Sequence, residues 1–205
     1  MIILPTSFCP SVGYLALIAA AEDKGETVSI DHGEQYQKQT LRNRAVFMTA
    51  SGLAPFTIPV AKYGYPAPPV SEILISEHGD WRHKLKHALR SGYGTSPFWV
   101  QYEREIRSLT FDDESTVLIE YNLRWLRWMM SKWGLETEIA FGSEEQGDRY
   151  TLEELSKADG GRYWQVFETR YGYISGLSSL DLLLCEGPYA IVYLKELGQK
   201  LLRSE

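Results

Sequence analysis

The sequence predicts an α/β protein in which a mixed sheet of short strands from the N-terminal third packs against a mainly helical C-terminal part. Three observations support this fold class. Strand-like runs alternate with a helical pattern in the first 30 residues, two strand-like runs flank a turn near residue 51, and helical periodicity dominates after residue 80. A chain of 205 residues can form one compact domain, so we expect residues 1–205 to be a single domain.

A strand, a helix and a second strand open the chain. Residues 2–4 are aliphatic, and residues 11–22 place apolar side chains at helical spacing, with Ser11 as the expected cap and Gly25 as the expected stop. Residues 27–30 then alternate as a strand. This succession favours a parallel crossover, and we expect the loops after the two strands to lie side by side.

The next predicted element is a β-hairpin with arms at residues 45–49 and 53–60. Pro55 and Pro59 cannot donate ladder hydrogen bonds, so the second arm should be an edge strand or irregular. Residues 73–75 predict one further short strand.

The rest of the chain is expected to be mainly helical. Asp80 should cap one helix and Ser96 a second helix at about residues 97–109, while residues 115–133 predict a long helix that is largely buried. The remaining patterned segments are a strand at 136–141, a short helix around 152–155, a helix that starts at Ser178 and a last helix at 188–203.

The amino-acid composition indicates which binding partners and which cellular compartment to expect. Hydrophobic residues make up 44% and charged residues 23% of the chain, and the net charge of −6 argues against a bulk electrostatic nucleic-acid binder. Two cysteines, Cys9 and Cys185, fit free thiols in a reducing compartment. No segment approaches the roughly 20 apolar residues of a membrane span. We therefore predict a soluble, cytoplasmic monomer or small homo-oligomer with no nucleic-acid partner.

The most informative segment is the polar stretch at residues 31–44, which lies between two strand-like runs. Its planar, multidentate side chains suit recognition of a polar or anionic small molecule, although a solvated connection is the alternative interpretation. These side chains are Gln37, Gln39, Arg42, Asn43 and Arg44.

Spacing within this stretch suggests separate roles for neighbouring residues. Arg42 and Arg44 are two residues apart and point the same way in an extended segment, whereas Asn43 points the other way and can pin the segment to the scaffold. We expect at least one arginine in a cleft. The alternative is that the arginines bridge Asp31 or Glu34 internally, in which case they stabilise the fold.

Other candidate residues have both chemical and structural interpretations. His83 and His87 are four apart on a predicted helix, the spacing at which two imidazoles can meet one metal ion, but solvated histidines are the favoured interpretation and we predict no metal site. Cys9 is either a nucleophile near a helix start or a small buried thiol. Asp181 is either a general base or the partner of Ser178 in a capping box. The sequence identifies no cofactor.

Several separated segments resemble the WbqC-like family of bacterial proteins. The most specific is residues 37–44, within the polar stretch. The other segments that carry the resemblance are residues 5–14, 31–36, 78–87, 96–98 and 165–188. The resemblance implies an association with surface-polysaccharide or O-antigen assembly, in which members are often described as glycosyltransferases. It assigns no catalytic mechanism to named residues.

Two function hypotheses follow. The first is a transferase, of glycosyl or acyl type, that acts on an activated, phosphate-bearing donor; the second is a non-catalytic ligand-binding or assembly protein that uses the same pocket. The expected catalytic bases are Asp31, His83 and His87. The expected ligand-binding residues are Tyr14, Gln37, Lys38, Arg42, Asn43, Arg44 and Phe98, with Tyr36 as a further aromatic support.

Overall fold

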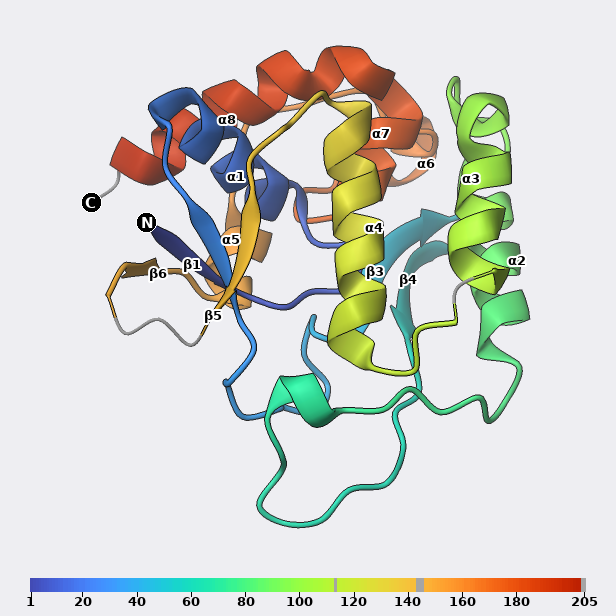
Figure 1. The fold of residues 1–205 in the computed structure, drawn as a ribbon. Helices are drawn as coiled ribbons and strands as arrows, with labels where there is room; N and C mark the ends of the chain where they lie inside the picture. Colours follow the sequence, from blue (N-terminus) through green and yellow to red (C-terminus); the bar gives the residue numbers. More distant parts are fainter. Residues whose placement is uncertain (113, 143–145, 204–205) are drawn as a thin grey trace.

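Two parallel strands and a buried helix form the centre of the protein. In a computed structural model, which describes residues 1–112, 114–142 and 146–203, β1 (Ile2–Pro5) pairs with β2 (Val28–Asp31). Their register runs from Ile2 opposite Val28 to Pro5 opposite Asp31, with α1 (Val12–Lys24) as the crossover (Figure 1). The predicted strand–helix–strand unit is confirmed, and the two following loops lie side by side.

Helix α1 is apolar on every side because other elements enclose it. All ten residues from Val12 to Ala21 are buried. Helix α8 (Ile191–Arg203) packs along it, and the short helix α5 (Leu152–Lys157) packs near its start. The expected stop is also confirmed, since Gly25 adopts the left-handed conformation at φ 65° and caps the helix.

In the main sheet, successive strands are added on one side of β1 and the last strand is added on its other side. Its order is β5-β2-β1-β6, and every pair in it is parallel. Strand β5 (Ile139–Gly142) extends the sheet beyond β2, whereas β6 (Asp148–Arg149) returns to pair on the other side of β1. The carboxyl ends of β1 and β6 therefore mark a topological switch point, which is where open parallel sheets place ligands.

A separate antiparallel hairpin lies between the sheet and a group of helices. Strands β3 (Arg44–Thr49) and β4 (Gly52–Thr57) pair in register from Arg44 opposite Thr57 to Thr49 opposite Gly52. Helix α2 (Trp81–Tyr93) packs on β3 and on α3 (Trp99–Phe111). Strand β4 pairs only with β3, so the proline-containing arm is an edge strand, as predicted.

Helix α4 (Leu118–Lys132) joins the hairpin side of the protein to the sheet side, as Figure 1 shows. Its Tyr121 and Trp125 are fully buried. Both rings contact Phe8 from the loop after β1, at centroid distances of 6.0 and 5.9 Å. The prediction of a long, largely buried helix is confirmed, although the helix starts at Leu118 instead of residue 115.

The α/β class and the predominance of helix after residue 80 are confirmed, but some details differ. Parallel and antiparallel pairings occur in two sheets instead of one mixed sheet, and two of the strands come from the C-terminal half. The predicted strand at 73–75 is wrong, because these residues make only isolated bridges after a 3₁₀ turn (Val70–Glu72). The C-terminal part also contains α6 (Glu168–Tyr171), α7 (Ser179–Glu186) and a 3₁₀ turn (Gly187–Ala190).

Three of the predicted helix caps are wrong because their side chains have other partners. Ser11 donates to the carbonyl of Leu155 and Ser96 to that of Tyr93. Asp80 is left-handed at φ 52°, and its carboxylate pairs with a histidine instead of capping α2. The cap at Ser178 is confirmed, since its hydroxyl accepts from the Leu180 amide.

We predict that Gly198→Ala destabilises the protein, because the added methyl group would lie 2.0 Å from the carbonyl oxygen of Ala16 and would force α8 away from α1. Overpacking of this kind costs about 1–3 kcal/mol in the free energy of unfolding. Thermal and urea unfolding would measure the change. Gly64→Ala is the matched control, because nothing lies within 4 Å of the added methyl group there. Equal melting temperatures for the two variants would contradict close α1–α8 packing.

Candidate functional site

A cleft of about 720 Å³ opens at the carboxyl ends of β1 and β6. One wall comes from the polar stretch and the hairpin, and the other from the segment that joins β6 to α5. The lining residues are Pro5, Glu34, Gln37, Gln39, Thr40, Leu41, Arg42, Arg44, Val46, Pro55, Arg149, Tyr150, Thr151, Leu152, Glu153 and Ser156. The cleft thus lies at the topological switch point of the sheet.

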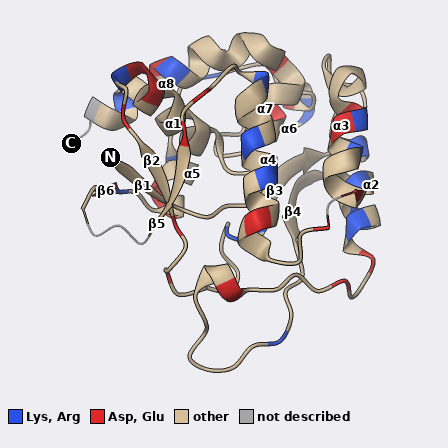
Figure 2. Ribbon diagram, viewed as in Figure 1, with Lys and Arg blue, Asp and Glu red and all other residues tan. Residues whose placement is uncertain are grey.

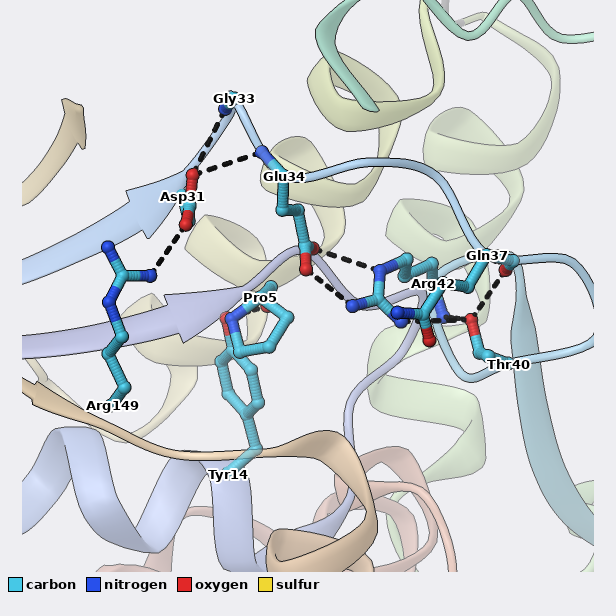
Figure 3. Close-up of polar contacts among 9 residues, drawn as sticks. All are labelled: Pro5, Tyr14, Asp31, Gly33, Glu34, Gln37, Thr40, Arg42 and Arg149. Atoms are coloured by element: carbon cyan, nitrogen blue, oxygen red, sulfur yellow. Dashed lines mark hydrogen bonds and ion pairs between the residues drawn. The ribbon is translucent and has the colours of Figure 1, made fainter. Parts of the chain in front are cut away.

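Asp31 lies at the end of β2, and both of its carboxylate oxygens accept hydrogen bonds. One carboxylate oxygen accepts from the amides of Gly33 and Glu34, both at 3.1 Å, which holds the turn after the strand. The other oxygen accepts from Arg149 at 2.7 Å. Figure 3 shows this ion pair beside Pro5 at the end of β1. Asp31 therefore serves as a clamp between β2 and β6 in this structure.

Arg42 forms an internal ion pair with Glu34. Its Nε donates to one carboxylate oxygen at 2.9 Å, and its Nη2 donates to the other, so the contact is bidentate. The remaining terminal nitrogen donates to the Thr40 hydroxyl at 3.2 Å (Figure 3). Arg42 is only 7% exposed, and a buried guanidinium requires such a partner. Of the two interpretations, internal bridging is the one that Arg42 adopts.

Glu34 faces the cleft and carries a perturbed carboxyl group. Burial raises its pKa, the hydrogen bonds and charge of Arg42 lower it, and the nearby charge of Asp31 raises it further; the net effect is a raised pKa. Tyr14 lies beneath this region, as Figure 3 shows, and its hydroxyl donates to the Pro5 carbonyl at 3.0 Å. Burial, with a smaller effect of the Glu34 charge, raises the pKa of Tyr14. Its hydroxyl therefore stays protonated as a hydrogen-bond donor.

Asn43 pins the polar stretch to the scaffold, in the orientation expected from its spacing. Its side-chain amide donates to the Ile58 carbonyl at 2.8 Å, and the residue is buried. Asn122 of α4 supports the same segment from below by donating to the Arg42 carbonyl and the Thr6 hydroxyl, at 2.8 and 3.0 Å. Two buried amides thus fix the backbone segment that carries the two arginines.

Arg44 is the arginine that faces the cleft without an internal ion pair in the described part of the chain. Its Nε donates to the Thr57 hydroxyl across the β3–β4 pair at 3.0 Å. That bond orients the guanidinium group, while neither terminal nitrogen has a hydrogen bond to a described residue. The Arg44 side chain is therefore anchored at its Nε atom, while its two terminal nitrogens can donate to a ligand.

Seven of the predicted site residues are not among the residues that line the cleft: Tyr14, Asp31 and Asn43, described above, and Lys38, His83, His87 and Phe98. Lys38 lies over the ring of Tyr63 at 4.8 Å. His83 and His87 are exposed on α2, where His83 pairs with Asp80 at 2.6 Å. Phe98 stacks on a tyrosine of α3. Within residues 1–112, 114–142 and 146–203, no three His, Cys, Asp or Glu side chains gather as a metal site would require.

Two other candidates are buried away from the cleft. Cys9 is 1% exposed, and burial raises the pKa of its thiol, so it stays protonated. Asp181 does not complete a capping box; its carboxylate accepts from the Tyr163 hydroxyl at 2.7 Å and lies near Gln165. Burial raises the pKa of Asp181 to about 6, against hydrogen bonds from Tyr163, Tyr93 and Gln165 that lower it.

No site residue was predicted in the second wall of the cleft, residues 149–156, although the short helix expected around residues 152–155 is confirmed as α5. Strand β6 has only two residues, too few for an alternating pattern, and its pairing with β1 is non-local. A local signal was nevertheless present. Thr151 and Glu154 form a capping box in which each side chain bonds the backbone of the other. That spacing marks the start of α5 and, with it, a strand-to-helix turn beside the sheet edge.

Comparison with known proteins gives a family. The model of the WbqC-like protein family matches residues 6–164. The chain belongs to this family. The match covers the loop after β1, the polar stretch and the start of α5, so most of the cleft lies within the WbqC-like region. Residues 165–188, which also suggested the resemblance, lie outside it.

No curated protein and no solved structure matches the chain. The WbqC-like assignment therefore rests on the family comparison alone. In addition, none of the helices in the described residues is long and apolar enough to cross a bilayer.

We predict that Arg42→Ala lowers the free energy of unfolding by about 2–3 kcal/mol, because it leaves the largely buried Glu34 carboxylate without its bidentate partner. Arg44→Ala is the control, since that guanidinium lies in no ion pair with a described carboxylate; its expected cost is about 0.5 kcal/mol. Urea unfolding of both variants would test this. Similar losses for the two would show that the Arg42–Glu34 pair does not stabilise the fold.

We also predict a distinctive pH dependence for Asp181→Asn. The pKa of Asp181 is about 6 in the folded protein, above the value of about 3.9 in an unfolded chain, so its stabilising contribution is full below pH ~4 and is lost as pH rises through about 6. The stability of the variant relative to the wild type should therefore rise by about 3 kcal/mol between pH 4 and pH 7. Urea unfolding at several pH values would measure it. A difference that is independent of pH would contradict the raised pKa.

Proposed function

We propose that this WbqC-like protein binds a small anionic molecule in the cleft and acts as a transferase in the assembly of bacterial surface polysaccharides, with an activated, phosphate-bearing donor as substrate. The observation that carries the proposal is the placement of Arg44 in a cleft at the switch point of a parallel sheet. The polysaccharide context comes from the family, and the binding chemistry comes from the cleft.

Charge pairing in the cleft supports an anionic ligand. Arg42 is neutralised by Glu34 and Arg149 by Asp31. Glu153, the remaining carboxylate of the lining, pairs with Lys157. This leaves the guanidinium group of Arg44 as the lining cation with no carboxylate partner in the described chain. A phosphate or carboxylate group can occupy that position through charge-assisted hydrogen bonds.

The remaining lining groups suit a ligand with hydroxyl groups. Gln37 and Gln39 contribute amides, and Thr40, Thr151 and Ser156 contribute hydroxyl groups that can donate or accept. Apolar side chains of the loop and the hairpin, among them Leu41, Val46 and Pro55, lie between these polar groups. Sugar-like molecules present alternating hydroxyl and C–H surface, which matches such a lining.

A transferase also needs a base, and Glu34 is the group that the geometry favours. Its carboxylate lines the cleft and is held by Arg42, whereas the carboxylate of Asp31 is not part of the lining and already accepts three hydrogen bonds. In this proposal Glu34 takes a proton from the acceptor, the acceptor attacks the donor, and the leaving phosphate is held by Arg44. Asp31 positions Arg149, and His83 and His87 have no part in the step.

A non-catalytic ligand-binding protein is the second candidate function. The observation that favours it is the bidentate contact of Glu34 with Arg42, since a carboxylate held in this way is a weaker base. The two functions differ in one measurable property. Glu34→Gln should abolish product formation and leave binding intact in a transferase, whereas a binding protein would form no product in either case.

We predict that Arg44→Gln weakens binding of an anionic ligand about tenfold, because it removes a charge-assisted contact, while Arg44→Lys restores part of the affinity. The ligand would first be found by thermal-shift screening with sugar nucleotides, acyl-thioesters and simple anions, since a ligand of the native state raises the melting temperature. Titration calorimetry would then compare the variants. Arg107→Gln, an exposed arginine on α3, is the matched control. Unchanged affinity in Arg44→Gln would contradict the proposed site.

A further inference from the structure

A second hollow, of about 530 Å³, lies at the same edge of the main sheet. We call it the α4 groove, because helix α4 supplies one side and the carboxyl ends of β2 and β5 supply the other. Its lining includes His32, Ile119, Leu123, Arg124, Arg127 and Phe141.

The turn after β2 separates the α4 groove from the cleft. His32 lines the groove, whereas Glu34, two residues later, lines the cleft. Asp31 holds the backbone between them through its bonds to the amides of Gly33 and Glu34. No residue lines both hollows, so a ligand in one leaves the other open.

Part of the lining of the α4 groove is apolar, with residues from both α4 and β5. Ile119 and Leu123, each only 4% exposed, form an apolar floor on the helix, and Phe141 contributes an exposed ring from the end of β5. Phe141 is 47% exposed, so a large aromatic side chain stays open to solvent at the end of the edge strand β5. Apolar surface that stays open to solvent beside polar groups is typical of a binding groove.

The lining also contributes positive charge and a polar atom that has no hydrogen-bond partner in the described part of the chain. Figure 2 shows the basic bands of α4, to which Arg124 and Arg127 belong. Arg127 is exposed and forms no ion pair with a described carboxylate, while Glu120 is the acidic member of the lining. The Nδ1 atom of His32 is buried and has no hydrogen-bond partner among the described residues. Buried polar atoms without partners are rare and point to a missing ligand or solvent group.

We propose that the α4 groove is a second binding site, for an anionic amphiphile. Its alkyl part would lie on Ile119, Leu123 and Phe141, and its phosphate or carboxylate head would contact Arg127 and the ring of His32. In the cleft, by contrast, charged, amide, hydroxyl and apolar side chains are interspersed along the lining. The site does not depend on the proposed transferase function.

Titration calorimetry with octyl phosphate, kept below its critical micelle concentration, tests this proposal. Wild-type protein should bind octyl phosphate at least tenfold more tightly than inorganic phosphate, because the alkyl chain buries apolar surface. Arg127→Gln should weaken octyl phosphate binding about tenfold, and Phe141→Ser should remove most of the advantage over inorganic phosphate. Octyl glucoside, which has the chain without the charge, should bind less tightly than octyl phosphate.

Arg107→Gln is the control and should bind octyl phosphate like the wild type. Arg44→Gln can lose phosphate binding in the cleft but should keep the octyl phosphate binding that Arg127→Gln weakens. A loss of binding in Arg44→Gln but not in Arg127→Gln would place the probe in the cleft and overturn the second site. Equal affinities for octyl phosphate and inorganic phosphate would overturn the assignment to an amphiphile. If octyl phosphate did not bind at all, both that assignment and the second site would be overturned. None of these outcomes depends on whether Arg44 binds a sugar nucleotide.

Discussion

The parallel pairing of β1 and β2 over a fully buried α1 is the constraint on which the rest of the structure depends. Because the strands run in the same direction, both carboxyl ends meet at one edge of the sheet, with Pro5 opposite Asp31. The polar loops that follow must then lie next to each other. The return of the chain to β6 on the far side of β1 opens a gap at this edge, and the cleft occupies it.

Charge is distributed in the cleft according to burial. Arg42 is almost inaccessible to solvent, and a guanidinium group in that position is tolerated only with the bidentate partner that Glu34 supplies. Arg44 sits at the start of β3 and is only partly buried, so water can solvate its charge. The two arginines of this short segment thus differ: Arg42 holds the loop, and Arg44 carries the charge that we propose meets a ligand.

The turn at residues 31–34 connects the two hollows mechanically. Helix α4 contributes to both sides of it: Asn122 bonds the backbone of Arg42 beneath the cleft, and neighbouring turns of the same helix line the α4 groove. A ligand that moved α4 or the turn would therefore act on both hollows. Since the two hollows share no lining residue among those described, each presents its own set of side chains to a ligand.

Local pattern alone determined much of this protein. The strand–helix–strand start, the hairpin, the core helix α4 and the polar stretch were all predicted from apolar spacing and turn residues, because these signals act between near neighbours in the chain. Only the tertiary structure determined the contacts between side chains that are far apart in the sequence or that meet where a loop folds back. The ion pair of Arg42 with Glu34 depends on how the loop folds back, Arg149 reaches the cleft through a two-residue strand, and Asp181 is buried by tyrosines from distant segments. Whether a polar side chain holds the fold or faces a ligand depends on these non-local contacts, and so the sequence identified the segment that forms the site while only the folded chain separated Arg44 from Arg42.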